Sequence, residues 1–380
     1  MTDTFYCASP WRGLHIGPTG HVRTCCSGQA PLGNLNSQSI TDILNGPALQ
    51  QIRQSLKNGI VPDYCKLCAD KEKINNASER AWHNTVNKDF DIAQASDQYE
   101  YPTLIDARWG STCNLSCNYC DPSSSSKWAT LVKWARPEPS ARTYYDAVCD
   151  FVQANNQHIR MVALLGGEPM LLPENDRFLD TLPDKCKITV FTNLSIDLEN
   201  NKIFQKLKER TNVGWSMSFD NIEDRFEYVR HGASWDKVLH NLDIMQTLFQ
   251  TGRHYGGVHA VYNMFNATRL CEFREFLNQR GLAVVWQQLM YPPALNPRNH
   301  GKEVARLALD EINLLYDTCA IEQHERDYFD AAAVDYQLQL NSNASMTTEL
   351  TKFISDIETK YHTNMQGKFV ELWPEFNNLS

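Results

Sequence analysis

The sequence has no run of about 18 apolar residues, the length that a membrane-spanning helix needs. Its start, MTDTFYCASP, lacks the basic and then apolar segments of a secretory signal peptide. Internal repeats and long low-complexity tracts are also missing, which excludes a collagen-like fibre and a disordered chain. These absences predict a cytoplasmic protein with no membrane partner.

An excess of positive charge is missing as well. The chain has 36 basic and 45 acidic residues, a net charge of −9, which argues against a general binder of phosphate backbones. Its nine tryptophans are dispersed and do not alternate with basic residues, as they would on a nucleic-acid surface. Nucleic acid is therefore not the expected partner.

Twelve cysteines in 380 residues are too few for a secreted disulfide scaffold. Eight of them nevertheless fall into two groups, one near the N-terminus and one after residue 110. Because cytosolic thiols stay reduced, clustered cysteines are typical of metal ligands or catalytic groups.

Short β-type runs alternate with amphipathic segments between residues 101 and 295, which predicts an α/β fold with a parallel sheet. The six expected strands cover residues 104–109, 161–165, 187–191, 213–219, 257–263 and 284–290. Six such units fit either a partial (β/α)6 barrel or an open doubly wound sheet.

Three further segments flank this core. Residues 1–75 contain five cysteines and a broken helical period that ends near Gly59, a residue suited to follow a helix end. Residues 76–100 are polar and indicate a linker or an exposed helical connection. Residues 296–380 are predicted to form a mostly helical extension.

A Cys-x3-Cys-x2-Cys triplet, Cys113, Cys117 and Cys120, directly follows the first predicted strand of the core. The carboxyl end of such a strand is where α/β enzymes carry their chemistry. Three thiolates leave one position of a cubane iron–sulfur cluster open, which indicates a reactive metal site. A zinc knuckle that lacks its fourth ligand is the alternative.

The segment CNLSCNYC, including Tyr119, resembles the signature of radical S-adenosylmethionine (SAM) enzymes. The resemblance implies a partial (β/α)6 TIM-type barrel and a [4Fe–4S] cluster whose open iron binds SAM. It also implies reductive cleavage of SAM to a 5′-deoxyadenosyl radical, with a flavodoxin or ferredoxin as reductant.

Further motifs resemble the segments that hold SAM in this family. LLGGEPM matches the Gly-Gly-Glu motif, whose glycines would let the backbone approach a ligand and whose carboxylate would suit the methionine amine. The resemblance assigns cofactor contacts to Tyr119, Gly166, Gly167, Glu168, Asn193, Ser216, Asp220 and Arg230. A turn with a solvated glutamate and a surface ion pair of Arg230 are the alternatives.

The N-terminal group supplies four thiolates, from Cys7, Cys25, Cys65 and Cys68. Cys26 is the alternative to Cys25. Four thiolates make a saturated site for zinc or for an iron–sulfur cluster, with unligated thiols as the third option. The Cys-x12-Gly-x4-Cys pattern resembles the opening of SPASM and twitch domains, which implies an auxiliary [4Fe–4S] cluster. Such domains usually follow the barrel, and the seven-cysteine SPASM set is absent here.

The resemblance favours hydrogen abstraction from a peptide or protein, because relatives with auxiliary clusters most often modify such substrates. A small molecule, such as a sugar, nucleotide or cofactor precursor, is the alternative substrate. A non-catalytic iron–sulfur or zinc protein is the alternative of another class.

Overall fold

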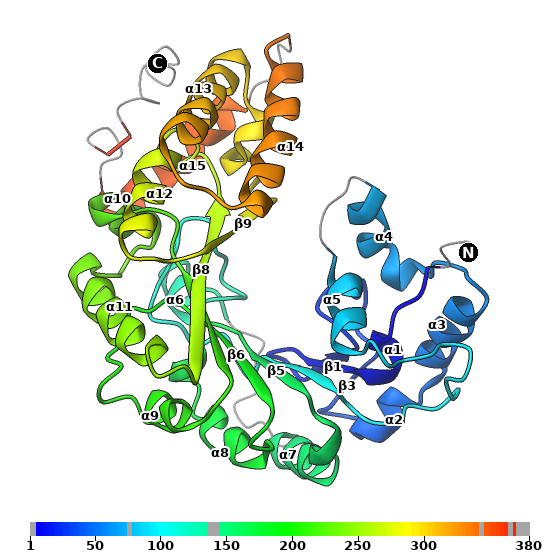
Figure 1. Ribbon diagram of the computed structural model, residues 1–380. Helices are drawn as coiled ribbons and strands as arrows, with labels where there is room; N and C mark the ends of the chain where they lie inside the picture. The colour runs from blue at the N-terminus through cyan, green and yellow to red at the C-terminus, as the bar shows by residue number, and fades with distance from the viewer. Residues whose placement is uncertain (1–4, 74–77, 136–143, 342–345, 364–367, 370–380) are drawn as a thin grey trace.

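The computed structural model describes residues 5–73, 78–135, 144–341, 346–363 and 368–369 (Figure 1). In these residues one sheet has the strand order β3-β2-β1-β4-β5-β6-β7-β8-β9. The strands are β1 (Gly13–Ile16), β2 (His21–Arg23), β3 (Gly33–Asn34), β4 (Leu104–Ala107), β5 (Met161–Leu164), β6 (Lys187–Thr192), β7 (Val213–Ser218), β8 (His254–Tyr262) and β9 (Val284–Gln288).

The six predicted strands are confirmed as β4 to β9, which lie side by side in chain order and are all parallel. A doubly wound sheet reverses its strand order, whereas a barrel winds in one direction, so this order selects the barrel. Neither β9 nor β3 has a second strand neighbour, so the barrel is partial.

Helices on the outer side of the curved sheet connect these strands (Figure 1). The helices of the described residues are α1 (Ser9–Arg12), α2 (Ile40–Leu44), α3 (Pro47–Lys57), α4 (Lys66–Lys73), α5 (Glu79–Val86), α6 (Ser126–Leu131), α7 (Tyr145–Ala154), α8 (Glu174–Thr181), α9 (Lys202–Glu209), α10 (Glu223–Val229), α11 (Trp235–Phe249), α12 (Leu270–Gln279), α13 (Lys302–Thr318), α14 (Gln323–Gln339) and α15 (Thr347–Tyr361). No helix in the part of the chain that the structure describes is long and apolar enough to cross a membrane.

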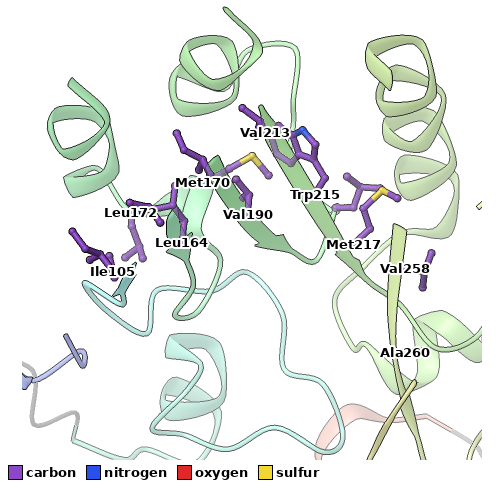
Figure 2. Close-up of a cluster of buried hydrophobic side chains, with 14 of the residues drawn as sticks. Ile105, Leu164, Met170, Leu172, Val190, Val213, Trp215, Met217, Val258 and Ala260 are labelled. Carbon is purple, nitrogen blue, oxygen red and sulfur yellow. The ribbon is translucent and has the colours of Figure 1, made fainter. Parts of the chain in front are cut away.

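The core lies between the sheet and the outer helices (Figure 2). Successive strand residues point to opposite faces, so Trp215 and Met217 of β7 are buried toward the helices while Ser216 and Ser218 face inward. The same alternation appears in β6, whose burial changes at every residue. The inward side chains of β6 and β7 are only half-buried, so the inner face of the sheet is open.

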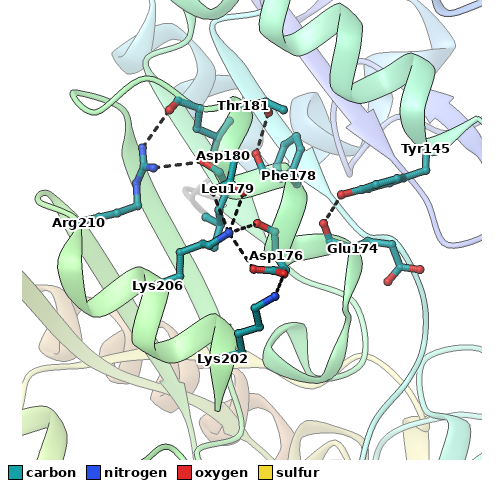
Figure 3. A network of polar contacts seen from close by, with 11 residues as sticks. Tyr145, Glu174, Asp176, Phe178, Leu179, Asp180, Thr181, Lys202, Lys206 and Arg210 are labelled. Carbon is teal, nitrogen blue, oxygen red and sulfur yellow. Dashed lines mark hydrogen bonds and ion pairs between the residues drawn. The ribbon is translucent and has the colours of Figure 1, made fainter. Parts of the chain in front are cut away.

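An ion-pair network joins α8 to α9 on the outer side of the barrel (Figure 3). Lys206 lies 2.8 Å from a carboxylate oxygen of Asp176 and 2.8 Å from one of Asp180, and Lys202 also pairs with Asp176. Because Lys202 and Asp180 are exposed and Lys206 and Asp176 are only half-buried, water screens these charges and each pair contributes about 1 kcal/mol or less.

The N-terminal segment extends the barrel sheet. Strand β1 is parallel to β4, with His15 opposite Asp106, and β2 and β3 follow as antiparallel strands. The polar stretch predicted as a linker or exposed helical connection contains α5, whose His83 is 1% exposed. Residues 5–73 and 78–100 therefore pack as a continuation of the sheet.

The broken helical period of residues 40–58 becomes two helices. Ser39 begins α2 by accepting a hydrogen bond from the backbone N–H of Asp42, and Pro47 begins α3. Gly59 has a φ of +70°, as expected for the residue that follows a helix end.

The C-terminal extension contacts the loop that carries Cys113, Cys117 and Cys120, which we call the triplet loop. The hydroxyl of Tyr361 at the end of α15 donates a hydrogen bond of 2.9 Å to the carbonyl of Ser116. Its ring stacks on His231 at 3.7 Å and contacts Trp128 of α6 edge-on. Residues 346–361 therefore cover part of the loop that carries Cys113, Cys117 and Cys120.

Arg53 of α3 is the polar centre of the N-terminal segment. Its guanidinium is fully buried and donates to the carbonyls of Pro10, Leu44 and Asp97 at 2.9 to 3.0 Å. Replacing it would leave these carbonyls without their donor, and unsatisfied buried acceptors cost about 1–3 kcal/mol each.

We expect Arg53→Met to lower the local free energy of unfolding of the N-terminal segment by about 3 kcal/mol. Amide hydrogen exchange in α3 should then accelerate about 100-fold. Lys57→Met, on the same helix, is the matched control, because Lys57 forms only a surface pair worth about 1 kcal/mol or less. Equal exchange rates in the two variants would contradict this role of Arg53.

Candidate functional site

The loop that carries the three thiols follows β4 and is held by backbone hydrogen bonds to other segments. The N–H groups of Ser116 and Asn118 donate to the carbonyls of His231 and Val229, at 3.0 and 2.8 Å. The hydroxyl of Ser125, just before α6, donates to the carbonyl of Leu115 at 2.6 Å. The indole N–H of Trp128 in α6 donates to the carbonyl of Cys117 at 2.7 Å. These contacts fix the three cysteines at the carboxyl end of the sheet.

Two polar side chains approach the thiols. The amide nitrogen of Asn193, just after β6, lies 3.8 Å from the sulfur of Cys113. A guanidinium nitrogen of Arg230, just after α10, lies 4.0 Å from the sulfur of Cys117. Burial raises the pKa of the Cys117 thiol to about 11, and Arg230 acts in the opposite direction. Both contacts are of the kind that stabilises sulfur carrying negative charge.

Asp220 lies just after β7, and both of its carboxylate oxygens accept hydrogen bonds from other groups of the protein. One oxygen is 3.0 Å from Arg230 and also accepts from the hydroxyl of Tyr119, while the other accepts from the N–H of Val261 at 2.6 Å. Asp220 is 1% exposed and Arg230 is 5% exposed. Arg230 is therefore not the surface ion pair of the alternative interpretation, and Asp220 orients Arg230 and Tyr119.

The two glycines of the Gly-Gly-Glu motif lie against the loop that precedes Cys113. A Cβ atom on Gly166 would come within 2.7 Å of the carbonyl oxygen of Gly110, and one on Gly167 within 2.1 Å of that of Thr112. Both glycines have positive φ, at +84° and +38°. In this structure the two glycines let the loop backbone approach closely, and their predicted contact with SAM stays a prediction.

Glu168 is completely buried, which excludes the solvated glutamate of the alternative interpretation. One carboxylate oxygen accepts from the N–H of Asn193 at 2.8 Å and from the hydroxyl of Thr192 at 3.2 Å. The other accepts from the N–H of Met170 at 3.3 Å. Burial raises the pKa of Glu168 to about 7, against the lowering effect of these hydrogen bonds.

Ser216 lies on the inner face of β7, opposite Phe191 of β6 and Gly257 of β8. It is half-buried, as is Ser218 two residues further on. The predicted SAM contacts thus form two groups: Tyr119, Asp220 and Arg230 around Cys117, and Glu168 and Asn193 on the side of Cys113.

The N-terminal thiols surround one cavity. Cys7, Cys25, Cys65 and Cys68 all line it, together with Phe5, Ser9, Pro10, Thr24, Ser27, Tyr64 and Arg80. Cys26, the alternative to Cys25, does not line the cavity and is exposed, with Glu79, Asp106 and Arg108 as its charged neighbours. Of these two cysteines, only Cys25 lines the cavity, and its role as a cluster ligand stays a prediction.

The spacing of the thiols tests which metal they fit. A zinc ion holds thiolates at about 2.3 Å, which puts neighbouring sulfurs roughly 3.8 Å apart. Among the described residues, no three of the four cavity cysteines have sulfurs within 4.8 Å of one another, and the same is true of Cys113, Cys117 and Cys120. Neither set of described cysteines therefore has the close spacing of thiolates that surround one zinc ion.

Sequence reasoning missed a charged group beside the triplet loop. Asp106 of β4 lies 3.0 Å from His15 of β1 and binds Arg108 through two hydrogen bonds of 2.9 Å. The side chain of Arg108 is 30% exposed. No sequence motif indicates this group, because His15 and Asp106 are brought together by the pairing of β1 with β4.

Two family models match the chain. The model of the Radical SAM superfamily matches residues 108–268, and SPASM, an iron–sulfur cluster-binding domain, matches residues 7–69. The chain is 22% identical over 204 residues to the GTP 3′,8-cyclase of Sulfurimonas denitrificans. That alignment covers 53% of this chain and 58% of the cyclase, so the chain spans little more than half of this curated relative.

Similar solved structures include native anSMEcpe with bound AdoMet, at 17% identity and a TM-score of 0.41 over 60% of this chain and 64% of that one. Streptococcus suis SuiB bound to the precursor peptide SuiA is 16% identical, with a TM-score of 0.40 over 70% of this chain and 52% of that one. TYW1 with a lysine–pyruvate adduct is 12% identical, with a TM-score of 0.38 over 59% and 77%.

We expect about eight irons per chain in anaerobically prepared protein, from two cubane clusters. Replacing Cys113, Cys117 and Cys120 by Ala should leave about four irons, and so should Cys25→Ser. Cys26→Ser is the matched control and should keep about eight, because its sulfur lies outside the cavity. Iron and sulfide analysis measures this, and loss of iron in Cys26→Ser instead of Cys25→Ser would reverse the assignment.

Proposed function

From the premise that this chain belongs to the radical SAM superfamily and has its iron–sulfur cluster-binding domain before the barrel, we propose that it abstracts hydrogen from a peptide or protein. The two matched domains imply a [4Fe–4S] cluster with SAM and a second, auxiliary iron–sulfur cluster. When bound, the first cluster supplies reductive cleavage of SAM to the 5′-deoxyadenosyl radical that abstracts hydrogen.

Cys113, Cys117 and Cys120 hold that cluster in this proposal, and Cys7, Cys25, Cys65 and Cys68 hold the auxiliary one. A flavodoxin or ferredoxin is the proposed reductant. The saturated set of four thiolates suits electron transfer or a folding role better than substrate ligation.

Arg230 is the proposed partner of the SAM carboxylate. It is a buried cation beside Cys117, and one of its guanidinium nitrogens, Nε, has no hydrogen-bond partner. Asp220 holds the guanidinium from the opposite side at 3.0 Å, which fixes its orientation without a movement on binding. Asp220 and Tyr119 act as positioning residues for this cation.

Glu168 and Asn193 are the proposed partners of the methionine amine. The buried carboxylate already accepts three hydrogen bonds from the protein, so it holds a defined position at the end of β5. A cation beside it would lower its raised pKa and keep it ionised. Ser216, on the open inner face, is the proposed contact of the ribose.

The observation that favours a peptide is the open inner face of the sheet. Apart from Lys187 at the amino end of β6, the side chains that point inward from β6 to β9 are neutral, and they are half-buried or exposed, namely Thr189, Phe191, Ser216, Ser218, Tyr255, His259, Val261, Val285 and Gln287. Small-molecule sites bury most of their ligand in an enclosed cavity. An open face of neutral polar and apolar side chains suits a longer substrate that covers the face itself.

A nucleotide is the second candidate, because the curated relative at 22% identity is a GTP cyclase. It would need cations for its phosphates. Among the inward side chains of β6 to β9, Lys187 is the one Lys or Arg, and it lies at the amino end of β6, where its ammonium is 5.1 Å from the centre of the Tyr255 ring. The nearest described candidate for such a contact is Arg108 after β4, which Asp106 already binds.

We expect Arg230→Lys to weaken SAM binding at least tenfold while the iron content stays unchanged, since a point charge cannot reproduce the planar guanidinium. Equilibrium binding of SAM to the iron-loaded protein measures this. Arg225→Lys, an identical change on the neighbouring helix α10, is the control and should bind SAM normally. Unchanged affinity in Arg230→Lys would remove Arg230 from the SAM site.

The substrate class can be tested by following deuterium into 5′-deoxyadenosine. The reduced enzyme with SAM is incubated either with a tryptic peptide pool from deuterated cells or with deuterated nucleotides that include GTP. We expect deuterium transfer from the peptides only, and none with Cys113, Cys117 and Cys120 replaced by Ala. Transfer from the nucleotides alone would overturn the peptide proposal and leave the radical chemistry intact.

A further inference from the structure

Two cysteines that belong to neither cluster site lie together between the barrel and the C-terminal helices. Cys271 is the second residue of α12, and Cys319 directly follows the end of α13. Their sulfurs are 3.0 Å apart. Non-bonded heavy atoms rest at about 3.5–4.0 Å, so the fold holds these sulfurs unusually close.

The two thiols differ in their surroundings. Cys271 is 8% exposed and lies in the first turn of α12. The hydroxyl of Thr318 lies 3.0 Å from its sulfur. Cys319 is half-buried, and burial together with its contact to Cys271 raises its pKa to about 12. Either of the two sulfurs could donate the hydrogen bond between them.

We propose that Cys271 and Cys319 form a reversible disulfide that links the barrel to the C-terminal helices. The oxidant is a low-molecular-weight disulfide of the glutathione class. The two thiols lose two electrons and two protons as their S–S bond forms. The S–S bond of the oxidant breaks, takes up those electrons and protons, and leaves as two thiols.

Glu275 is the third group near the two sulfurs, and its carboxylate lies within 4.8 Å of both. Two cysteines and a carboxylate could also hold a zinc ion. Sulfurs bound to zinc would lie roughly 3.8 Å apart, which is wider than the observed 3.0 Å. The separation thus favours a bond between the sulfurs over a shared metal.

The disulfide would act on the C-terminal helices, which contact the loop that carries Cys113, Cys117 and Cys120. Helix α13 leads through α14 to α15, where Tyr361 donates to the carbonyl of Ser116. A covalent bond between α12 and the end of α13 closes a long loop and reduces the freedom of the unfolded chain. The disulfide would therefore hold the C-terminal helices on the barrel without consuming any cluster cysteine.

The test uses full-length, iron-loaded protein under anaerobic conditions. Oxidised glutathione is added at a concentration that leaves the absorbance of the clusters unchanged. Free thiols are then alkylated, and the digested protein is searched for a linked peptide. We expect the Cys271–Cys319 peptide in the wild type, a midpoint of thermal unfolding about 2 °C higher, and reversal of both by dithiothreitol.

Cys319→Ser should show neither the linked peptide nor the thermal shift, while its iron content stays at the wild-type value. Cys149→Ala is the matched control, because Cys149 is 1% exposed on α7 and lies away from the pair. It should behave as the wild type. Alkylation of both Cys271 and Cys319 after oxidation would overturn the proposal. One bound zinc per chain that is lost in Cys319→Ser would overturn it as well.

Discussion

The backbone of residues 108–125 is the constraint on which the site depends. This stretch has no helix or strand of its own, so its shape comes from hydrogen bonds to the segments around it. The N–H of Glu168 donates to Thr112, and the carbonyls after α10 accept from the segment between Cys113 and Cys120. The three thiols are therefore held by neighbours that also supply the proposed SAM contacts.

Charge is balanced locally within this site. Arg230 lies between the sulfur of Cys117 and the carboxylate of Asp220, and all three groups are almost completely removed from water. A buried cation needs such partners, because an unpaired one costs several kcal/mol or more. One guanidinium thus lies beside both a sulfur and a carboxylate, and its Nε has no hydrogen-bond partner among the described residues.

The N-terminal segment and the C-terminal helices both contact the barrel through specific pairs. Strand β1 adds to the barrel edge beside β4, and in the turn after β2 Cys25 lines the N-terminal cavity whereas Cys26 does not. At the other end of the chain, Cys271 meets Cys319 and Tyr361 meets Ser116. The open inner face of the sheet lies between these two extensions (Figure 1).

The alternation of short apolar runs with amphipathic helices was enough to predict all six barrel strands, because it depends only on local periodicity. The spacing of Cys113, Cys117 and Cys120 likewise identified a cluster motif within eight residues. Local periodicity and motif spacing could not predict the contacts between residues that are distant in the sequence. The glycines that fit the loop, the binding of Arg230 by Asp220, and the position of Cys25 rather than Cys26 at the cavity all depend on segments brought together by strand pairing. The sequence thus determined the helices and strands and predicted the cluster cysteines. Tertiary structure decided which side chains lie beside the thiols, because these contacts join residues that are 80 and 113 positions apart in the chain.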